Sequence, residues 1–89
     1  MRQGNGQPAL TPDLNELRSF FVAANLGSLG RAAVRLHVSQ PSLPKRLASL
    51  EAKVGARLLE RSPRGVMLTT AGRRLYRDAR ILFEQAPSC

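Results

Sequence analysis

The sequence has little of what a disulfide framework, a metal centre or a membrane anchor requires. Cys89 is the only cysteine, so no disulfide can form within the chain. His37 is the only histidine, and a metal site needs more ligands than these two residues supply. No apolar run approaches the length of a membrane span, and the N-terminus has no apolar signal-peptide core. We therefore expect a soluble protein of the reducing cytoplasm, without a cofactor and without a membrane partner.

Acidic and aromatic residues are also scarce. Six Asp and Glu stand against 14 Lys and Arg, which gives a formal net charge of +8 over 89 residues. Most of this excess is arginine, whose guanidinium forms forked hydrogen bonds with phosphate oxygens and guanine edges. The charge suits a polyanionic partner, although ribosomal and membrane-surface proteins share it. With three Phe and one Tyr, the chain lacks the interleaved aromatics on which single-strand binders stack bases.

The length allows one domain with one modest core, preceded by a tail. Residues 1–12 are rich in Gly, Gln and Pro, and we expect a mobile tail that adds one arginine to a nucleic-acid contact. Asp13, with Glu16 three residues on, predicts the capping box of a first helix, which Gly27 ends. The apolar residues of this helix recur at helical spacing and indicate a structural role: Leu14, Leu17, Phe20, Phe21 and Ala24.

Residues 28–54 predict two short helices joined by a tight turn. Ser28 caps the first of these helices. Its inner face carries Leu29 and Leu36 with two small residues, Ala32 and Ala33, between them. Small residues let two helices approach closely, as a compact helix-turn-helix requires.

The second helix of this pair carries a narrow apolar stripe. We expect His37 and Val38 to form the turn, Ser39 to cap the helix and Gly55 to end it. The stripe consists of Leu43, Leu47, Leu50 and Val54. Opposite the stripe lie Pro41, Lys45, Ala48 and Ser49, with Ser42 and Arg46 on one flank. A polar, basic face here is typical of a helix placed in the DNA major groove, and the alternative is a solvated face.

A β-hairpin is predicted to follow. The strands are residues 58–61 and 66–69, and the turn between them contains Pro63 and Gly65 with Arg64 at its tip. A hairpin after a recognition helix is a wing. Its arginine either enters the narrow, electronegative minor groove or is an exposed turn residue, and the residues alone leave both interpretations open.

A last helix is predicted from Thr69 or Thr70 to about Ala86. Its apolar stripe repeats every three to four residues and consists of Leu75, Ala79, Leu82 and Ala86, widened by Tyr76 and Phe83. Once the other elements are placed, little of the domain remains for this stripe to cover. An unmatched apolar stripe seeks a second copy, so we expect a homodimer formed through this helix.

Taken together, these segments closely resemble the N-terminal winged helix-turn-helix domain of LysR-type bacterial transcriptional regulators. The resemblance runs from about Asp13 to Gln85. Its most specific parts are RAA at 31–33, VSQPSL at 38–43, LE at 50–51, GARLLER at 55–61 and LTTAG at 68–72.

The resemblance implies a mainly α fold with a two-stranded wing. It divides the chain into a tail (1–12), a winged helix-turn-helix DNA-binding domain (13–69) and a linker and dimerisation helix (70–89). The larger effector-binding domain of the family is expected to be absent, and with it any small-molecule effector site. The expected partners are a second copy of the chain and double-stranded DNA that carries an interrupted inverted repeat.

The resemblance also assigns residues to these contacts. Four face the major groove, namely Gln40, Pro41, Ser42 and Lys45, and Arg64 acts from the wing. Ser39 and the start of its helix, with Arg31 and Arg35, meet phosphates, as helix N-termini do. Ser28 and Arg46 complete the predicted DNA-binding set. The predicted dimer interface consists of Leu75, Ala79, Leu82, Phe83 and Ala86.

Two positions depart from the family pattern. Pro44 stands where members usually carry Ser or Thr, and a proline one turn into a helix removes an amide donor. We expect a distorted first turn and an altered base preference. Gly30 likewise replaces a usual Ser or Thr, so one hydroxyl-to-phosphate contact is expected to be missing.

Three alternatives to sequence-specific DNA binding remain. Pro44 and Gly30 favour a non-specific architectural binder, because both lack contact groups. The last helix alone would also suit a dimerisation module that pairs with a full-length relative. Enzymatic activity is the weakest interpretation, because Ser42 and Lys45 lie on an exposed face without a third partner, and His37 is expected to be a surface or capping residue.

Overall fold

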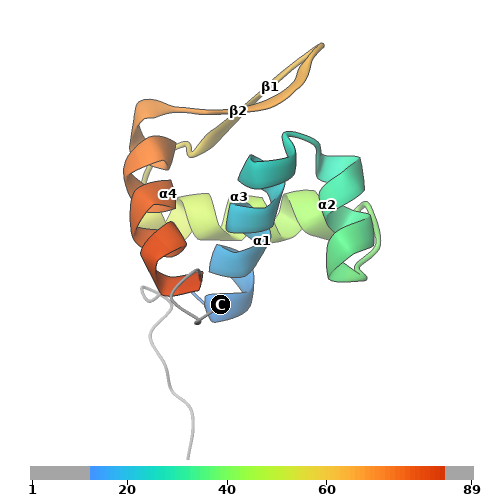
Figure 1. Cartoon of the computed structure of the whole chain (residues 1–89), viewed down its shortest axis with the longest axis horizontal. Helices are drawn as coiled ribbons and strands as arrows, with labels where there is room; N and C mark the ends of the chain where they lie inside the picture. The colour runs from blue at the N-terminus through green and yellow to red at the C-terminus, as the bar shows by residue number, and fades with distance from the viewer. Residues whose placement is uncertain (1–12, 84–89) are drawn as a thin grey trace, which may run out of the picture.

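The computed structural model describes residues 13–83, which form four helices and one antiparallel pair of strands (Figure 1). The elements in chain order are α1 Leu14–Leu26, α2 Leu29–Leu36, α3 Ser42–Val54, β1 Leu59–Ser62, β2 Gly65–Leu68 and α4 Thr70–Phe83. The expected mainly α fold with a two-stranded wing is therefore confirmed. The expected tail and Ala86 lie outside the described residues. Within residues 13–83, no helix has the length and apolar character needed to cross a membrane.

Most helix ends fall where the capping residues predict them. The Asp13 carboxylate and the Glu16 side chain form the capping box of α1, which ends at Gly27 with φ 65°. The Ser28 hydroxyl accepts a hydrogen bond from the Arg31 amide at the start of α2. The Thr69 hydroxyl accepts one from the Gly72 amide, which makes Thr69 the residue that caps α4. Local polar groups satisfy the first amides of each of these helices.

The start of α3 differs from the prediction. Ser39 does not cap the helix: α3 begins at Ser42 after Pro41, two residues later than a Ser39 cap implies. A helix that began at Gln40 would need the Pro44 nitrogen to donate to the Gln40 carbonyl, and proline has no hydrogen there. Residues 39–42 form a turn instead, in which the Ser42 amide donates to the Ser39 carbonyl at 3.1 Å. The expected distortion at Pro44 thus takes the form of a later start.

The core lies around α1, which packs against α2, α3 and α4 (Figure 1). Its innermost members come from three elements and the segment before β1, and they are Phe20, Ala23, Ala32, Ala33, Leu43, Leu50 and Leu58. Leu14 and Val54, expected in the apolar stripes, are 58% and 41% exposed because each stands at the end of its helix. The two alanines of α2 are fully enclosed, as the close helix-turn-helix approach requires.

The apolar stripe of α4 has a partner within its own chain, contrary to the expectation. Ala79 is only 1% exposed. Phe21 of α1 stacks on Tyr76, with 5.2 Å between ring centroids, and makes a tilted contact with Phe83 at 5.3 Å. The Tyr76 hydroxyl also donates to the Asn25 side chain. The sequence pattern could not reveal that α1 covers this stripe, because α1 presents a second apolar face beside the one it turns to α2 and α3.

Backbone contacts hold the wing to the helical body. The Val66 amide of β2 donates to the Gly27 carbonyl at the end of α1, at 3.0 Å. Gly65 has φ 126°, and a Cβ there would lie 2.3 Å from the same carbonyl oxygen. Only glycine satisfies both conditions. The turn at the far end is closed by Ser62, whose hydroxyl accepts from the Arg64 amide at 3.2 Å.

A second close approach seats α4. A Cβ on Gly72 would lie 2.1 Å from the Leu58 carbonyl oxygen and 3.2 Å from the Leu68 side chain. The Thr69 hydroxyl donates to the Arg57 carbonyl at 2.6 Å, and the Thr69 amide donates to the Leu58 carbonyl at 3.0 Å. Helix α4 therefore starts in direct backbone contact with the segment between α3 and β1.

The two helical glycines provide a stability test with opposite expected signs. Gly72→Ala should lower the free energy of unfolding by about 1–3 kcal/mol, because the new methyl group meets backbone atoms that cannot move aside. Gly30→Ala is the matched change, since the one close contact of its Cβ, at 2.9 Å, is with the flexible end of the Gln40 side chain. It should leave stability unchanged or raise it by up to about 1 kcal/mol through helix propensity. Urea unfolding of both variants decides the matter, and equal effects would contradict the packing described for Gly72.

Candidate nucleic-acid interface

A buried carboxylate holds α3 against α1. Glu16 accepts a hydrogen bond from the Ser49 hydroxyl at 2.6 Å and from the Lys53 ammonium at 3.0 Å, both from α3. Ser49 therefore faces α1, whereas the helical pattern placed it on the outer face. Burial raises the pKa of Glu16, but the hydrogen bonds from Ser49, Lys53 and the Asp13 amide, with the charge of Lys53, outweigh it and lower the pKa overall. The ionised Glu16 thus sets which face of α3 points outward.

The outward face at the start of α3 carries the predicted reading residues. Gln40, Pro41 and Lys45 are exposed, and Ala48 continues the face with a small side chain. Ser39 is exposed and Ser42 half-buried, and their hydroxyl oxygens lie 2.7 Å apart. The structure brings these side chains together at the start of α3, where they can present hydroxyl, amide and ammonium groups to a DNA groove.

The backbone at this point contributes less than expected. The first turn of α3 has four amide positions, of which Pro41 and Pro44 carry no hydrogen and Ser42 donates to the Ser39 carbonyl. Three of the four are therefore unavailable to an anion, and the predicted phosphate site at this helix N-terminus has to rely on side chains.

The start of α2 lies beside the turn that precedes α3. The Gln40 side-chain nitrogen is 2.9 Å from the position that a Cβ on Gly30 would occupy. Ser28, half-buried, already accepts from the Arg31 amide. Arg31 and Arg35 are exposed along α2, and within residues 13–83 neither side chain has a hydrogen-bond or ion-pair partner. Two uncommitted guanidiniums therefore flank the reading residues.

Arg46, one of the predicted DNA contacts, is turned toward α1. It is half-buried, and its guanidinium donates to the hydroxyl of Ser19 in α1 at 3.3 Å. Ser19 is fully buried and donates in turn to the Asn15 carbonyl. Arg46 thus packs between α3 and α1, and its contact with DNA stays a prediction.

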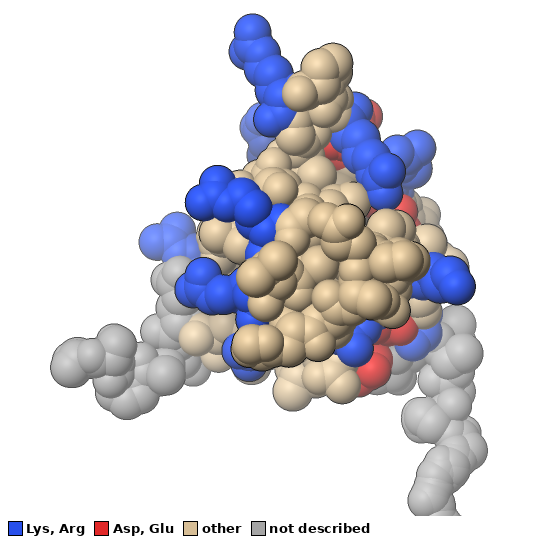
Figure 2. All heavy atoms as spheres, turned by 90° about the vertical axis from the view of Figure 1, so that its right-hand side faces the viewer, with Lys and Arg blue, Asp and Glu red and all other residues tan. Residues whose placement is uncertain are grey.

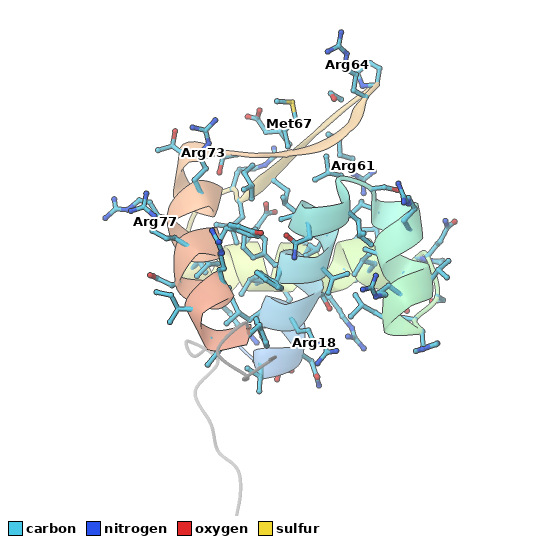
Figure 3. All side chains as sticks on the ribbon, viewed as in Figure 1. Arg18, Arg61, Arg64, Met67, Arg73 and Arg77 are labelled. Atoms are coloured by element: carbon cyan, nitrogen blue, oxygen red, sulfur yellow. The ribbon has the colours of Figure 1, made fainter. Side chains whose placement is uncertain are left out.

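Arginines also stand on and beneath the wing. Arg64 lies at the tip of the hairpin, and Arg61 lies on the side of the hairpin that faces α2 (Figure 3). Figure 2 views the α2 end of the molecule, where Lys and Arg side chains project from the hairpin and from both flanks of a largely uncharged face.

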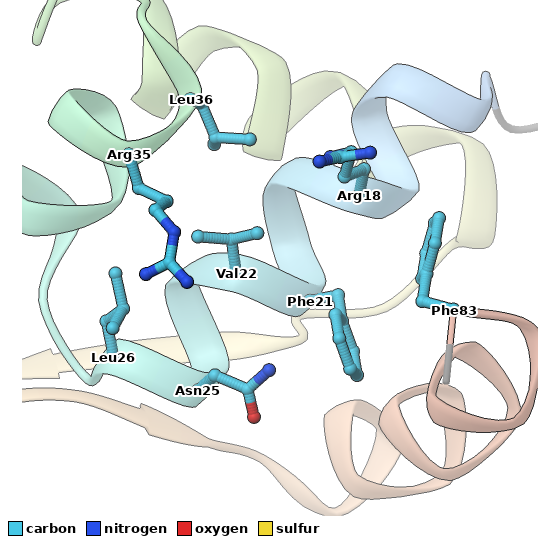
Figure 4. A pocket seen from close by; sticks show the side chains of 8 residues that line it. All are labelled: Arg18, Phe21, Val22, Asn25, Leu26, Arg35, Leu36 and Phe83. Carbon is cyan, nitrogen blue, oxygen red and sulfur yellow. The ribbon is translucent and has the colours of Figure 1, made fainter. Parts of the chain in front are cut away.

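Three basic residues beside this surface were not predicted from the sequence. A groove of about 330 Å³ separates the wing from α3, and Arg57 and Arg61 line it together with Pro44 and Ala48. Alternation along β1 gives the signal for Arg61, because it shares a strand face with the buried Leu59. A hollow of about 280 Å³ between α1, α2 and the end of α4 adds Arg18, which lies across from Arg35 (Figure 4).

Two of the residues considered for catalysis, His37 and Ser42, form local structural contacts. His37 ends α2 in the left-handed conformation with φ 59°, and its amide donates to carbonyls of α2. It is exposed, as expected for a capping residue. The hydroxyl of Ser42 lies against that of Ser39. Among residues 13–83, no group of three or more His, Cys, Asp or Glu is placed to hold a metal ion.

Comparison with known proteins agrees with this geometry. Residues 14–73 match the family model described as bacterial regulatory helix-turn-helix protein, lysR family. Among curated proteins, the chain is 45% identical over 74 residues to the HTH-type transcriptional regulator TcbR of Pseudomonas sp. strain P51. The match covers 83% of this chain and 25% of TcbR. The chain thus spans about a quarter of that relative's length.

Solved DNA complexes have the same fold. The DNA-binding domain of CbnR in complex with DNA is 44% identical, with a TM-score of 0.76, over 83% of this chain and 85% of that one. The BenM DNA-binding domain with its DNA site is 34% identical, with a TM-score of 0.76, over 82% and 85% of the two chains.

The Glu16 network predicts a defined dependence of stability on pH. Because its pKa in the folded protein lies below the ordinary value of 4.5, Glu16 stabilises the fold fully above that pH. The contribution is lost as the pH falls through the lower folded-state pKa. Glu16→Gln should cost about 1.5–3 kcal/mol at pH 7, as loss of hydrogen bonds to a charged group does. The difference from the unchanged protein should shrink in acid.

Urea unfolding between pH 3 and 7 measures this effect. Glu60→Gln is the matched control, since it removes the same charge from the exposed side of β1 and none of these hydrogen bonds. A Glu16→Gln deficit that stays constant down to pH 3 would show that the ionised carboxylate does not hold α3.

Proposed function

The chain belongs to the LysR family of bacterial regulatory helix-turn-helix proteins, and we propose that it reads double-stranded DNA as a homodimer. In this proposal α3 enters the major groove, and the wing reaches the adjacent minor groove. The observation that carries it is the exposed cluster of Gln40, Pro41 and Lys45 at the start of α3, flanked by the exposed guanidiniums of α2. The names of the solved DNA complexes support the same partner.

The reading and positioning roles divide between side chains. The Gln40 carboxamide suits the paired donor and acceptor of an adenine edge, and the Lys45 ammonium suits guanine acceptors. Arg31 and Arg35 suit phosphate oxygens, which fix the register without reading sequence. The hydroxyls of Ser39 and Ser42 add neutral donors in place of the missing amides of α3.

The wing extends the contact along the duplex. Arg64 at the tip suits a narrow minor groove, where the negative potential is enhanced. Arg57 and Arg61, in the groove between wing and α3, suit the phosphates of the strand that crosses between the two DNA grooves. DNA bound to this surface would be attracted by part of the net positive charge. Arg73 and Arg77 lie outside the surface, because they project from α4 on the other side (Figure 3).

The dimer is assigned to the outer face of α4. Leu75, Ala79 and Phe83 pack within the chain, so the surface left for a second copy centres on Ile81 and Leu82. These two are 62% and 52% exposed. We propose residues 13–69 as the DNA-reading unit and α4 as the linking helix. Two such units related by a two-fold axis suit an interrupted inverted repeat, in the bacterial cytoplasm.

Selection of tight binders from a random duplex library at near-physiological salt tests the proposal. The 89-residue chain should enrich an inverted repeat. Gln40→Ala and Lys45→Ala should each relax base preference at particular positions by about 1–3 kcal/mol, because base-edge contacts are lost. Arg31→Ala should instead weaken binding to all sequences alike and lower the salt slope by about one.

The possible outcomes separate this proposal from a non-specific architectural binder. Binding without enrichment of any sequence would favour the architectural interpretation. An enriched site that Gln40→Ala and Lys45→Ala leave unchanged would contradict the placement of α3. Glu60→Gln serves as the control for a charge change on the exposed side of the wing.

Leu82→Asp tests the dimer. A charge on the proposed interface costs desolvation in the dimer only, so the variant should sediment as a folded monomer where the unchanged chain forms a dimer. Val34→Asp is the matched control, because Val34 of α2 is an exposed apolar residue at 73%. If Leu82→Asp and Val34→Asp sediment alike, α4 does not form the interface.

A further inference from the structure

Gly30 has no backbone reason to be glycine. It lies in the first turn of α2, and its φ is not in the left-handed region that favours glycine. Glycine within a helix lowers helix stability relative to alanine. The atoms within 4 Å of a Cβ at this position are the Gln40 side-chain nitrogen at 2.9 Å and the Ser28 hydroxyl oxygen at 3.9 Å. The space above Gly30 is therefore taken up by the side chain of Gln40.

Gln40 depends on this space because nothing else holds its side chain. It is exposed in the turn before α3, and no hydrogen bond of its carboxamide occurs among the described residues. The residues on either side of Gln40 do not hold its carboxamide, because the Ser39 hydroxyl contacts that of Ser42 and Pro41 has no amide hydrogen. The bare backbone at Gly30 is thus the surface against which the carboxamide rests.

We propose that Gly30 is a specificity-determining residue that acts through Gln40. Because position 30 lacks a side chain, the Gln40 carboxamide lies over the first turn of α2, and that placement sets which base edge it meets. A bidentate contact with a base needs both hydrogen bonds within a few tenths of an ångström and with good angles. A methyl group at position 30 pushes the carboxamide outward and breaks this alignment. The inference rests on the proposed function, in which Gln40 reads the major groove.

This role is distinct from a structural one. A Cβ at 2.9 Å from the end of a flexible, exposed side chain is relieved by rotation of that side chain. Gly30→Ala should therefore leave the fold intact while it changes the direction in which Gln40 points. A glycine needed for packing, such as Gly72, would behave in the opposite way.

A double-mutant cycle on DNA tests the inference. The unchanged chain, Gly30→Ala, Gln40→Ala and the double variant are titrated against the selected duplex and against duplexes with each base pair replaced in turn. Gly30→Ala should alter discrimination at the base pair that depends on Gln40 by at least about fivefold. In the Gln40→Ala background the same change should have no effect at that base pair. Val34→Ala, a change at a 73% exposed position of the same helix, is the matched control.

Each other outcome overturns the inference in a recognisable way. If Gln40→Ala changes discrimination but Gly30→Ala does not, the inference fails and the proposed function stands. If Gly30→Ala has the same effect with and without Gln40, Gly30 acts by another route and the inference fails. If Gln40→Ala alters no base pair, the placement of Gln40 in the groove fails together with the inference. Urea unfolding of Gly30→Ala shows whether the folded state is retained in each case.

Discussion

The ionised, buried carboxylate of Glu16 is the interaction on which the placement of α3 depends. A charge removed from water is costly unless other groups replace its hydration. Ser49 and Lys53 supply two of the replacing hydrogen bonds, and both belong to α3. Rotation of α3 about its axis would break both bonds at once. The direction in which Lys45 points is therefore fixed by residues one and two turns farther along the same helix, which have no part in the proposed DNA contact.

The wing and α4 are placed by a different constraint, the direct contact of backbone with backbone. Gly65 lets β2 bond to the end of α1, and Gly72 lets α4 start against the Leu58 carbonyl. Neither contact leaves room for a side chain between the two segments. The tip of the wing consequently stands at a distance from α3 that backbone geometry determines, which leaves a groove lined by Arg57 and Arg61.

Local signals predicted the fold well, and non-local ones account for what was missed. Caps such as Asp13, Ser28 and Gly55 act over three or four residues, so sequence spacing reveals them. The partner of the α4 stripe could not be found this way, because Phe21 is far from Phe83 in sequence. The orientation of Ser49 was predicted wrongly for the same reason. Its hydroxyl turns inward because it donates to the buried carboxylate of Glu16, which is far from it in the sequence.

The start of α3 shows how two prolines reshape recognition without changing the fold. Pro41 and Pro44 remove the amides with which a helix N-terminus would bind a phosphate, and they shift the helix start past Gln40. Gln40 is thereby released from the helix into a turn, where helical geometry no longer directs its side chain. Its orientation must come from a neighbouring surface, and the bare backbone of α2 at Gly30 is that surface. The two departures from the family pattern, Pro44 and Gly30, are thus parts of one arrangement. Pro44 keeps Gln40 outside the helix, and Gly30 leaves the space that the Gln40 side chain occupies.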